Sequence, residues 1–572
     1  MHTDGHGCPH DRTQKENRSM NDEHQPFQID EPAPAGTPLP AVTPAVHKSV
    51  HYDLFLTILA WAAWAAGYML CVVIPITECL FGAFAMEVVL FAGALVLVGC
   101  RNRLCLARGT VIAVFCVILS AAFLVTTNQA IQVCVFLFTA VSWFYMVFVL
   151  SGSSEERFPG DRFLWETCRS VFVTPFNAPG NLFQAIFSGR QADGTPRKAR
   201  FGHIFGMIML GLGAAVIPTI IVAVLLSYDK GFSDLIERIF DFTIVGHFIH
   251  RSVVGLLIAS LMFGALLYAL HKPDSSQKND DLALRIGGGS HVAPVIVSCA
   301  ALFPLLVLYV IFFISQWDYY MSAFTGVLPD GLTYAAYARE GFFQLCTVAG
   351  INAGLALLAA VLTKRRAYDP ARPDRDRVPP ALRVALSVLS LFTLVLIATA
   401  VSKMLLYVDA FGLTQKRVYA AWFMLLLAVA FIVVLIRQVW HRMNLVGTLL
   451  CVFLVFFLAI SVVNVDGMIV SYNVDRCLEG NISTMKGERD SNKIEVLEDA
   501  GVSAVLPALR FMDETADSTD PDISAIREKT EKFLQKQADR LDGASFWEKN
   551  FVGIRAERAL RDRAYMDHNQ IQ

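Results

Sequence analysis

The sequence predicts an all-α, polytopic helical membrane protein with about 11 transmembrane helices and a small α-helical C-terminal appendage. Hydrophobic residues make up 55% of the 572 residues and charged residues only 17%, whereas soluble domains carry about 25% charged residues. The hydrophobic residues come in long runs, and about 20 residues of helix cross a hydrocarbon core of about 30 Å. A β-barrel would instead show alternating segments of about ten residues, a pattern that the sequence lacks.

The first 53 residues form a hydrophilic segment ahead of the first apolar run. Pro, Asp, Glu, Gln and Asn are abundant there, with 4 Lys and Arg against 8 Asp and Glu. Such a composition cannot bury enough apolar surface to offset the entropy lost on folding. We therefore expect residues 1–53 to be a disordered tail. The apolar run that starts at Leu54 lies too far along for a cleaved signal peptide and is predicted to be the first span.

Eleven apolar segments are long enough to cross a bilayer as helices, which makes residues 54–463 a predicted transmembrane domain. The second segment carries Glu87 near its middle, and an amphipathic stretch precedes the sixth. The predicted spans are 54–74, 79–99, 109–127, 130–150, 204–226, 252–270, 292–314, 343–362, 384–402, 418–436 and 445–463.

The charges of the connections predict which side of the membrane each one faces. Alternate connections, beginning with 100–108, carry 22 Lys and Arg, and the opposite set carries 7. Basic residues gather on the cytoplasmic side. We therefore expect a cytoplasmic N-terminus and, after an odd number of spans, an extracytoplasmic C-terminal tail in the cell (plasma) membrane.

The tail, residues 464–572, is acidic and is predicted to fold as helices. It holds 15 Lys and Arg against 21 Asp and Glu. Apolar residues recur at helical spacing in Lys493–Glu514 and Asp522–Leu541, and another helix is expected over Ser545–Arg563.

The sequence predicts no cofactor, no metal site and no nucleic-acid partner. Most of the 12 cysteines lie in or beside apolar spans, where they behave as small hydrophobic residues. No CxxC pair or Cys/His ligand spacing occurs, and neither tail is basic. The lipid bilayer is the one partner that the composition itself predicts.

Four segments together carry a family resemblance. They are YMSAFTGVLPDGLTYAAYAREGFFQLCTVAGIN at Tyr320–Asn352, KMLLYVDAFGLTQKRVY at Lys403–Tyr419, NVDGMIVSYNVDR at Asn464–Arg476, and SFWEKNFVGIRAERAL from Ser545. From about residue 200 onward the chain resembles the polytopic bacterial membrane proteins grouped as domain-of-unknown-function family 4173. The resemblance implies this architecture in a bacterial membrane and implies no established activity.

Three of these segments contain connections that the charge bias places outside the cytoplasm, and they form a hypothetical pocket for a polar, lipid-derived or envelope-derived ligand. Arginine suits phosphate or carboxylate because its planar fork donates two parallel hydrogen bonds. The alternative interpretation is structural: Arg and Asp pair across the connections, and the aromatic residues anchor helices at the interface. The candidate residues are Asp318, Tyr319, Asp330, Tyr337, Arg339, Asp409, Arg417, Asn464 and Asp466.

Glu87 is a second candidate, because a carboxylate near the middle of a bilayer is costly unless it is paired, protonated or facing water. A proton-coupled transporter can use such an acid. The alternative is that Glu87 only packs against another helix.

Three functions remain open from the sequence. The first is a non-enzymatic envelope sensor or scaffold that acts through its extracytoplasmic loops and tail. The second is a secondary transporter or permease that uses Glu87 or the polar ends of the spans. The third is a membrane enzyme that acts on a lipid-linked substrate through Asp318, Asp409 and Arg339.

Overall fold

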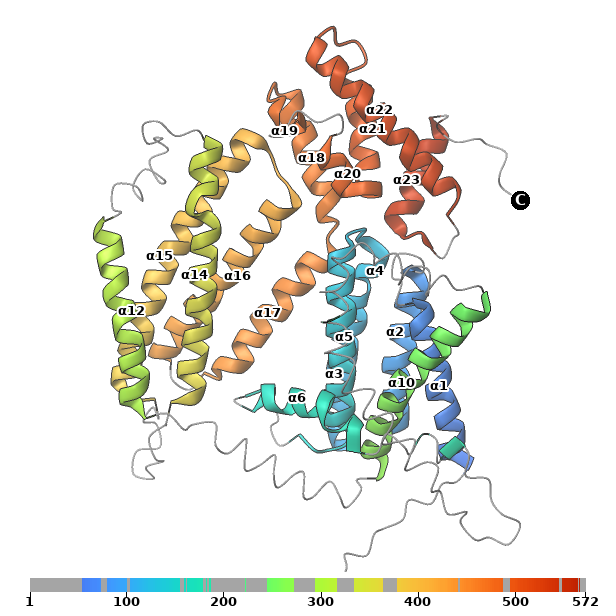
Figure 1. The fold of residues 1–572 in the computed structure, drawn as a ribbon, viewed down its shortest axis with the longest axis vertical. Coiled ribbons are helices and arrows are strands. Elements are labelled where there is room, and N and C mark those ends of the chain that lie inside the picture. The colour runs from blue at the N-terminus through green and yellow to red at the C-terminus, as the bar shows by residue number, and fades with distance from the viewer. Residues whose placement is uncertain are drawn as a thin grey trace, which may run out of the picture. The chain divides into compact units, whose positions relative to one another are not determined.

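The computed structural model places all its described residues in the unit Lys48–Gln572. The described residues are 54–73, 80–99, 103–154, 159–160, 162–177, 182, 185–186, 222, 244–271, 294–315, 334–363, 378–440, 443–486, 494–544, 548–563 and 565. The predicted tail 1–53 and, except for Val222, the predicted span 204–226 lie outside these residues. Every regular element of the described part is a helix (Figure 1).

The N-terminal helices form one bundle around a shared apolar core. Its long members are α1 (Leu54–Val73), α2 (Leu80–Ala94), α3 (Arg103–Ser120), α5 (Gln129–Leu150) and α10 (Ile244–His271). A π-helical turn, η2 (Leu95–Gly99), extends α2, and the short α4 (Ala122–Val125) follows α3. Leu56, Phe91, Cys116, Met146 and Phe263, one from each long helix, are buried in the same cluster.

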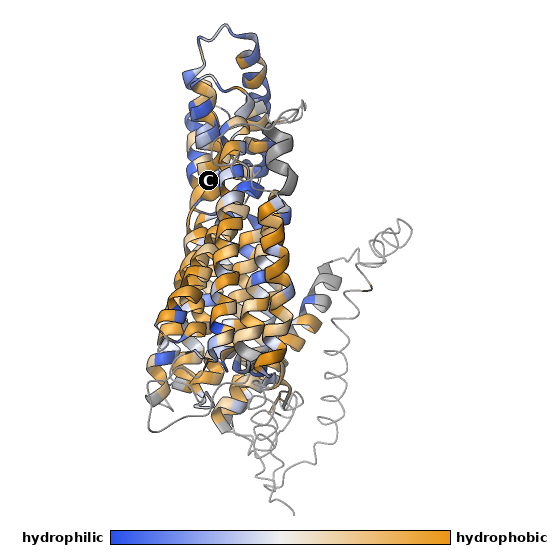
Figure 2. Cartoon of the chain, turned by 90° about the vertical axis from the view of Figure 1, so that its left-hand side faces the viewer, coloured by the Kyte–Doolittle hydropathy of each residue, from blue (hydrophilic) through white to orange (hydrophobic). Residues whose placement is uncertain are grey.

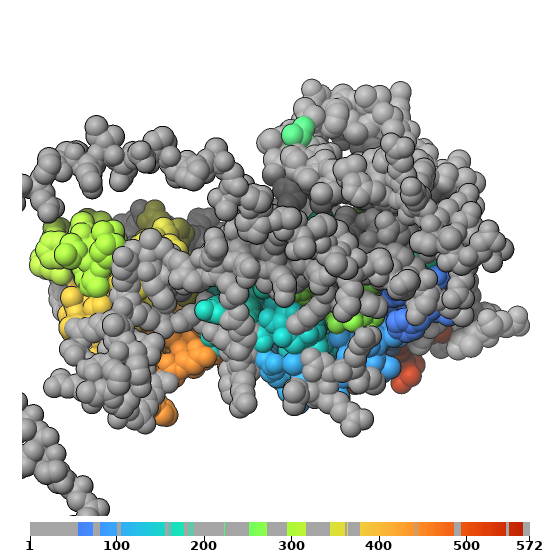
Figure 3. Space-filling view, turned by 90° about the horizontal axis from the view of Figure 1, so that it is seen from below, coloured from blue at the N-terminus to red at the C-terminus, as the bar shows by residue number. Residues whose placement is uncertain are grey.

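Two short helices follow α5 along the chain. They are α6 (Phe163–Phe172) and the 3-10 turn η3 (Pro175–Asn177). α6 packs on α5, and η3 packs on α10. Seen from below, the surfaces of α5 and α6 in cyan lie beside that of α10 in green (Figure 3).

A second group of long helices has its own core. Its members are α12 (Val295–Ser315), α14 (Tyr334–Leu362), α15 (Pro380–Phe411) and α16 (Gln415–Val439). A polar chain crosses this core: the Tyr309 hydroxyl donates to Asn352 Oδ1 at 2.6 Å, and Asn352 Nδ2 donates to Thr393 Oγ1 at 2.9 Å. Interhelical hydrogen bonds of this kind hold apolar helices together where packing alone gives little preference.

The last of the long apolar helices, α17 (Leu445–Val462), connects the two groups. Phe457 and Ile460 are buried against Leu119 and Phe123 of α3 and α4. On its other side, Trp422 of α16 donates its indole N–H to the carbonyl oxygen of Phe456 at 3.0 Å. This indole bond and the apolar contacts of α17 make it the bridge between the bundles.

The tail is helical, as predicted, and has a separate core. Its helices are α18 (Val465–Leu478), α19 (Ser483–Lys486), α20 (Glu495–Ala500), the 3-10 turn η4 (Gly501–Ala504), α21 (Val505–Glu514), α22 (Pro521–Asp542) and α23 (Phe551–Asp562). Val474, Leu497, Phe511, Leu534 and Leu560 are buried together. Figure 2 shows the contrast in hydropathy: the long helices are largely hydrophobic, whereas the tail helices mix both kinds of residue.

Among the described residues, eight helices are long and apolar enough to span a membrane, so the predicted count of 11 is not confirmed. They are Leu80–Gly99, Cys105–Val125, Gln129–Leu150, Arg251–Leu270, Val295–Ser315, Pro380–Phe411, Gln415–Val439 and Leu445–Val462. Two more predicted spans are helical with apolar stretches that are shorter, Phe55–Cys71 and Gln344–Ala360. The remaining one, 204–226, is the span outside the described residues.

Hydrogen bonds join connections that the charge bias assigns to the same side. Asn444 Nδ2 donates to the carbonyl oxygen of Pro159 at 2.8 Å, which links two connections of the basic set. Thr127, the last residue of the predicted span 109–127 and next to a connection of the opposite set, has its hydroxyl 2.7 Å from that of Ser503 in the tail. The alternation of sides therefore agrees with these contacts, and the choice of cytoplasmic side stays a prediction.

Two glycines allow α1 and α10 to cross with their backbones in contact. A Cβ atom on Gly67 would collide with the carbonyl oxygen of Gly255, and one on Gly255 would lie 2.8 Å from the backbone N and Cα of Tyr68. Small residues at such crossings are a general device for close helix packing in membranes. Gly93 of α2, by contrast, has no atom within 4 Å of a Cβ built on it.

We expect Gly67→Ala and Gly255→Ala each to lower the free energy of unfolding by about 1–3 kcal/mol, because the two helices must separate to admit a methyl group. Gly93→Ala, the matched control, should leave stability unchanged or raise it by up to about 1 kcal/mol through helix propensity. The measurement is unfolding of the purified protein in detergent micelles. Equal behaviour of all three variants would contradict the crossing.

Candidate functional site

The structure leaves part of the predicted pocket untested. Asp318, Tyr319 and Asp330 lie outside the described residues. Tyr337 and Arg339 belong to the first two turns of α14, and only their backbone is described. A role for these five residues stays a prediction.

The other two predicted segments, the connection after α15 and the start of the tail, come together. Asp409 near the end of α15 pairs with Arg476 of α18 at 2.6 Å, and Arg476 also contacts Glu479 at 3.2 Å. Asn481 Nδ2 donates to the backbone oxygen of Asp409 at 3.1 Å. The Asp409 carboxylate is therefore part of an ion pair across the two segments.

Asn473 holds the connection between α15 and α16 in place. Its side chain forms both hydrogen bonds of the Leu413 backbone: Oδ1 accepts from the Leu413 N–H at 2.7 Å, and Nδ2 donates to the Leu413 oxygen at 2.8 Å. Gly412 turns the chain there with a φ of 74°, a conformation that favours glycine, and a Cβ on it would collide with Asn473 Oδ1. The tail thus recognises the backbone of this connection.

Arg417 is directed back onto the end of α15. Its guanidinium donates to the carbonyl oxygens of Phe411 at 3.0 Å and Gly412 at 2.5 Å, and it lies 3.9 Å from the ring centroid of Tyr407. The last carbonyls of a helix lack intrahelical partners, and the guanidinium satisfies two of them. These contacts are those of the structural interpretation, and anion binding by Arg417 stays a prediction.

Asn464 and Asp466 lie at the start of α18, next to the ends of the membrane helices. Asn464 Oδ1 caps the helix by accepting from the N–H of Gly467 at 3.1 Å, and it also accepts from the Ser503 hydroxyl at 2.9 Å. Asp466 is buried and accepts from Gln415 Nε2 of α16 at 3.0 Å. Both predicted residues therefore join the tail to other parts of the chain.

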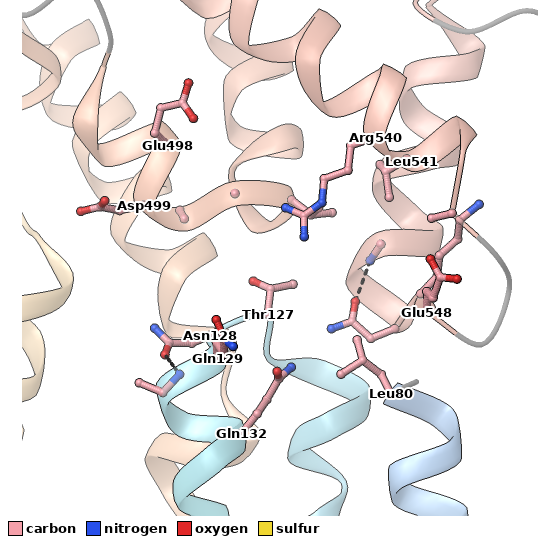
Figure 4. Close-up of a pocket in the computed structure, with 18 of the residues that line it drawn as sticks. Leu80, Thr127, Asn128, Gln129, Gln132, Glu498, Asp499, Arg540, Leu541 and Glu548 are labelled. Carbon is pink, nitrogen blue, oxygen red and sulfur yellow. Dashed lines mark hydrogen bonds between the residues drawn. The ribbon is translucent and has the colours of Figure 1, made fainter. Parts of the chain in front are cut away.

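A cleft of about 690 Å³ lies beside these contacts, between the tail and the ends of α2, α5 and α16 (Figure 4). The membrane helices and their connections contribute Leu80, Thr127, Asn128, Gln129, Ala130, Gln132 and Gln415. The tail contributes Glu498–Val502, Arg540, Leu541, Gly543, Ala544, Glu548–Asn550 and Gly553. None of these lining residues was among the predicted candidates.

Amide side chains on the floor of the cleft form hydrogen bonds with the backbone at the break between α4 and α5. The carbonyl oxygen of Thr126 accepts from Gln132 Nε2 at 2.8 Å and from Asn550 Nδ2 of the tail at 3.0 Å. Asn128 caps α5 through Oδ1, and its Nδ2 donates to the hydroxyl of Tyr419 in α16 at 2.9 Å. Three separate helices are therefore tied together below the cleft.

The charged side chains on the cleft walls differ in their pairing. Glu498 is paired with Lys536 at 2.6 Å, and Lys549 is paired with Glu557 at 2.9 Å. Arg540, in the last turn of α22, extends toward Thr127 (Figure 4). The cleft is therefore lined by amides, a hydroxyl, the guanidinium of Arg540, the ammonium of Lys549 and the carboxylates of Glu498, Asp499 and Glu548.

A repeated sequence pattern marks part of this site. Asn is followed by Gly at the third position in NLVG from Asn444, NVDG from Asn464 and NFVG from Asn550, and each Asn caps a helix by accepting from that glycine. Asn is among the preferred residues at helix N-caps. The pattern predicts three helix starts, and it contains no information on what the caps contact.

Glu87 lies on the buried face of α2. It is 5% exposed, and its Oε1 accepts from the Thr139 hydroxyl of α5 at 2.7 Å. One turn further along α2, the Trp143 indole N–H donates to the Leu90 oxygen at 3.0 Å. The predicted intramembrane acid is thus inside a helix of spanning length and has a polar partner on the neighbouring one.

The helices and this junction define a multi-pass membrane protein whose helical tail packs on the ends of its spans. The chain belongs to the family described as Domain of unknown function (DUF4153), whose model matches residues 111–508. The resemblance to family 4173 was wrong in the family number, although a domain of unknown function was the right kind of family. None of the curated proteins and none of the solved structures matches the chain.

The pKa of Asp466 bears on how the tail is held. Burial raises the pKa of this carboxyl above its ordinary value of 3.8, while hydrogen bonds from Asn128 and Gln415 lower it. Because the net direction is upward, the folded protein binds this proton more tightly than the unfolded chain does. The contribution of Asp466 to stability is therefore largest in acid and falls as the pH rises from 3.8 through the raised pKa.

We expect the wild-type protein to lose thermal stability relative to Asp466→Asn as the pH rises through that window. The amide does not titrate, so the difference between the two proteins isolates this one group. Asp517→Asn, at an exposed position of the same tail, controls for the loss of a charge. A difference that stays constant or grows in the opposite direction with pH would contradict the assignment.

Proposed function

We propose that this protein is a membrane sensor that binds a small polar ligand in the cleft between its tail and its membrane helices. The observation that carries the proposal is that both parts of the chain line one cleft. We further propose that the protein resides in the cell membrane with its N-terminus in the cytoplasm and its tail outside. The excess of Lys and Arg in the set of connections that begins with 100–108 supports that orientation.

The contacts around the cleft suggest how binding is relayed. The tail is held by hydrogen bonds at Thr127, Gln415 and Asn550, each of modest net strength, about 1 kcal/mol. A ligand that contacts both walls adds interactions that exist only while the tail is docked. It therefore shifts the population toward the docked state, and this shift is the signal.

The test is to fill the cleft from the membrane side. Ala130 is exposed, lines the cleft and is replaced by tryptophan; Ala525→Trp, at an exposed position of α22 outside the cleft, is the matched control. The purified protein is screened by thermal shift against amino acids, sugars, sugar phosphates and polyol phosphates. We expect a compound that stabilises the wild type and slows hydrogen exchange in α22 and α23. Both effects should vanish in Ala130→Trp and persist in Ala525→Trp.

A compound that stabilises Ala130→Trp as much as the wild type binds elsewhere and contradicts the proposal. Binding that leaves the exchange of the tail unchanged contradicts the relay, because the tail would then be docked equally in both states.

A second candidate function, a proton-coupled transporter, is supported by the Glu87–Thr139 hydrogen bond. A carboxyl group between two apolar helices is costly to retain without a role. Thr139 gives the carboxyl a partner on α5, and Ala83 and Val135, on the buried faces of α2 and α5, are small or medium in size. The Glu87 carboxyl, with Thr139 as its partner, can bind and release a proton as α2 and α5 move.

For this candidate, Glu87→Gln should abolish proton uptake into proteoliposomes that contain a pH-sensitive dye, because the amide keeps the shape of the side chain but carries no exchangeable acid proton. Thr139→Ser, which keeps the hydroxyl, should retain uptake. Uptake by Glu87→Gln at the wild-type rate, or no uptake by the wild type above empty liposomes, would exclude the transporter.

A further inference from the structure

Arg540 is the starting point of a narrower assignment for the cleft. It lies in the last turn of α22, and its side chain extends across the cleft toward Thr127 and the start of α5 (Figure 4). Among the described residues, the Arg540 side chain has no hydrogen-bonding or ion-pair partner. The same is true of the exposed side-chain amide of Gln129.

Several other basic side chains of the tail are paired, including two on or near the cleft walls. Lys549 contacts Glu557 at 2.9 Å, Lys536 contacts Glu498 at 2.6 Å, and Arg563 contacts Asp513 at 2.5 Å. Since Lys536 already neutralises Glu498, that carboxylate does not compete for Arg540. The neighbouring Asp499 extends away from Arg540 (Figure 4).

The rest of the lining is suited to hydroxyl groups. The exposed side chain of Gln129 has a carbonyl acceptor and an amide donor, which match a hydroxyl that both donates and accepts. Gln132 is buried, and its Nε2 already donates to the Thr126 oxygen. No aromatic side chain occurs among the described residues that line the cleft. A flat ring would therefore find no stacking surface there, which disfavours nucleobases and aromatic ligands.

We propose that the cleft binds an anionic polyol, a molecule with one phosphate or carboxylate for Arg540 and hydroxyl groups for the amides. The guanidinium fork forms two parallel charge-assisted hydrogen bonds with such an anion. This assignment rests on the proposed function, since it names the ligand class of the same cleft.

Two sources can supply this chemistry. Leu80 and Gln129 line the cleft and are the first residues of the spanning helices Leu80–Gly99 and Gln129–Leu150. The cleft is therefore level with the ends of spans, where a phosphoglycerol lipid headgroup is found. A free polyol phosphate from the aqueous phase has the same groups.

The probe is glycerol 3-phosphate, and its binding to the full-length protein in detergent is measured by calorimetry. Glycerol supplies the hydroxyls without the charge, and inorganic phosphate supplies the charge without the carbon-bound hydroxyls. We expect glycerol 3-phosphate to bind at least about tenfold more tightly than either. Arg540→Gln should weaken its binding by about tenfold or more. Arg558→Gln, at an exposed position outside the cleft lining, should change it less than twofold, or about 0.4 kcal/mol.

The source is read from nanodiscs. If lipid is the ligand, phosphatidylglycerol nanodiscs occupy the cleft and block glycerol 3-phosphate, whereas phosphatidylcholine nanodiscs do not. If a soluble compound is the ligand, it binds equally in both. Each result supports an anionic polyol and assigns its origin.

The inference is overturned if glycerol 3-phosphate binds no better than phosphate, or if Arg540→Gln and Arg558→Gln bind it alike. Should another compound then bind in a manner that Ala130→Trp blocks, only the ligand class is wrong and the sensor stands. Should Ala130→Trp block no compound at all, the sensor is wrong as well.

Discussion

The carbonyl oxygen of Thr126, at the break between α4 and α5, accepts hydrogen bonds from two amides, one of them in the tail. Thr126 is buried in the protein, so its carbonyl oxygen is shielded from water and needs a partner within the chain. Gln132 supplies one partner from the first turn of α5, and Asn550 supplies the other from more than 400 residues further along the chain. The position of the tail follows from this requirement.

The same requirement explains why the junction is polar but has few ions. Amides and hydroxyls satisfy helix ends at little desolvation cost, whereas an unpaired carboxylate would be expensive to bury. Asp466 is the exception, and the amides of Gln415 and Asn128 face it. On the cleft walls Glu498 and Lys549 are each paired with an opposite charge of the tail. A ligand in the cleft would therefore meet amides, paired charges and the guanidinium of Arg540.

Much of the fold was predictable from the sequence, because long apolar runs and helical periodicity are local signals. Ten predicted spans correspond to apolar helices, and the tail helices over Glu495–Glu514, Pro521–Asp542 and Phe551–Asp562 lie close to their expected positions. α15 is longer than predicted, since Pro380 fits the first turn and the turn at Gly412 ends it. Its C-terminal extension places Lys403 inside a buried helix face rather than at a span end.

The cleft was not predictable in this way. Its lining joins residues near 130, 415, 500 and 550, and no periodicity relates positions so far apart. The contacts of Arg417 with the carbonyl oxygens at the end of α15 could not be predicted either, because they depend on how the chain turns at Gly412. Anion binding by Arg417 stays a prediction. Asp409, a predicted candidate, pairs with Arg476, which was not one, and this ion pair is of the kind that the structural interpretation expects.

Asn128, Asn444 and Asn550 each cap a helix with the side-chain oxygen and reach a distant segment with the nitrogen of the same amide. The side-chain oxygen can cap a helix only after the helix has formed. The side-chain nitrogen of the same amide is therefore oriented toward its distant acceptor only after that step. Asn550 lies 424 residues after Thr126, so during synthesis its hydrogen bond to the Thr126 carbonyl oxygen can form only long after α5 has been made. Gln132, which comes from the same region of the chain as Thr126, can satisfy that oxygen before the tail docks.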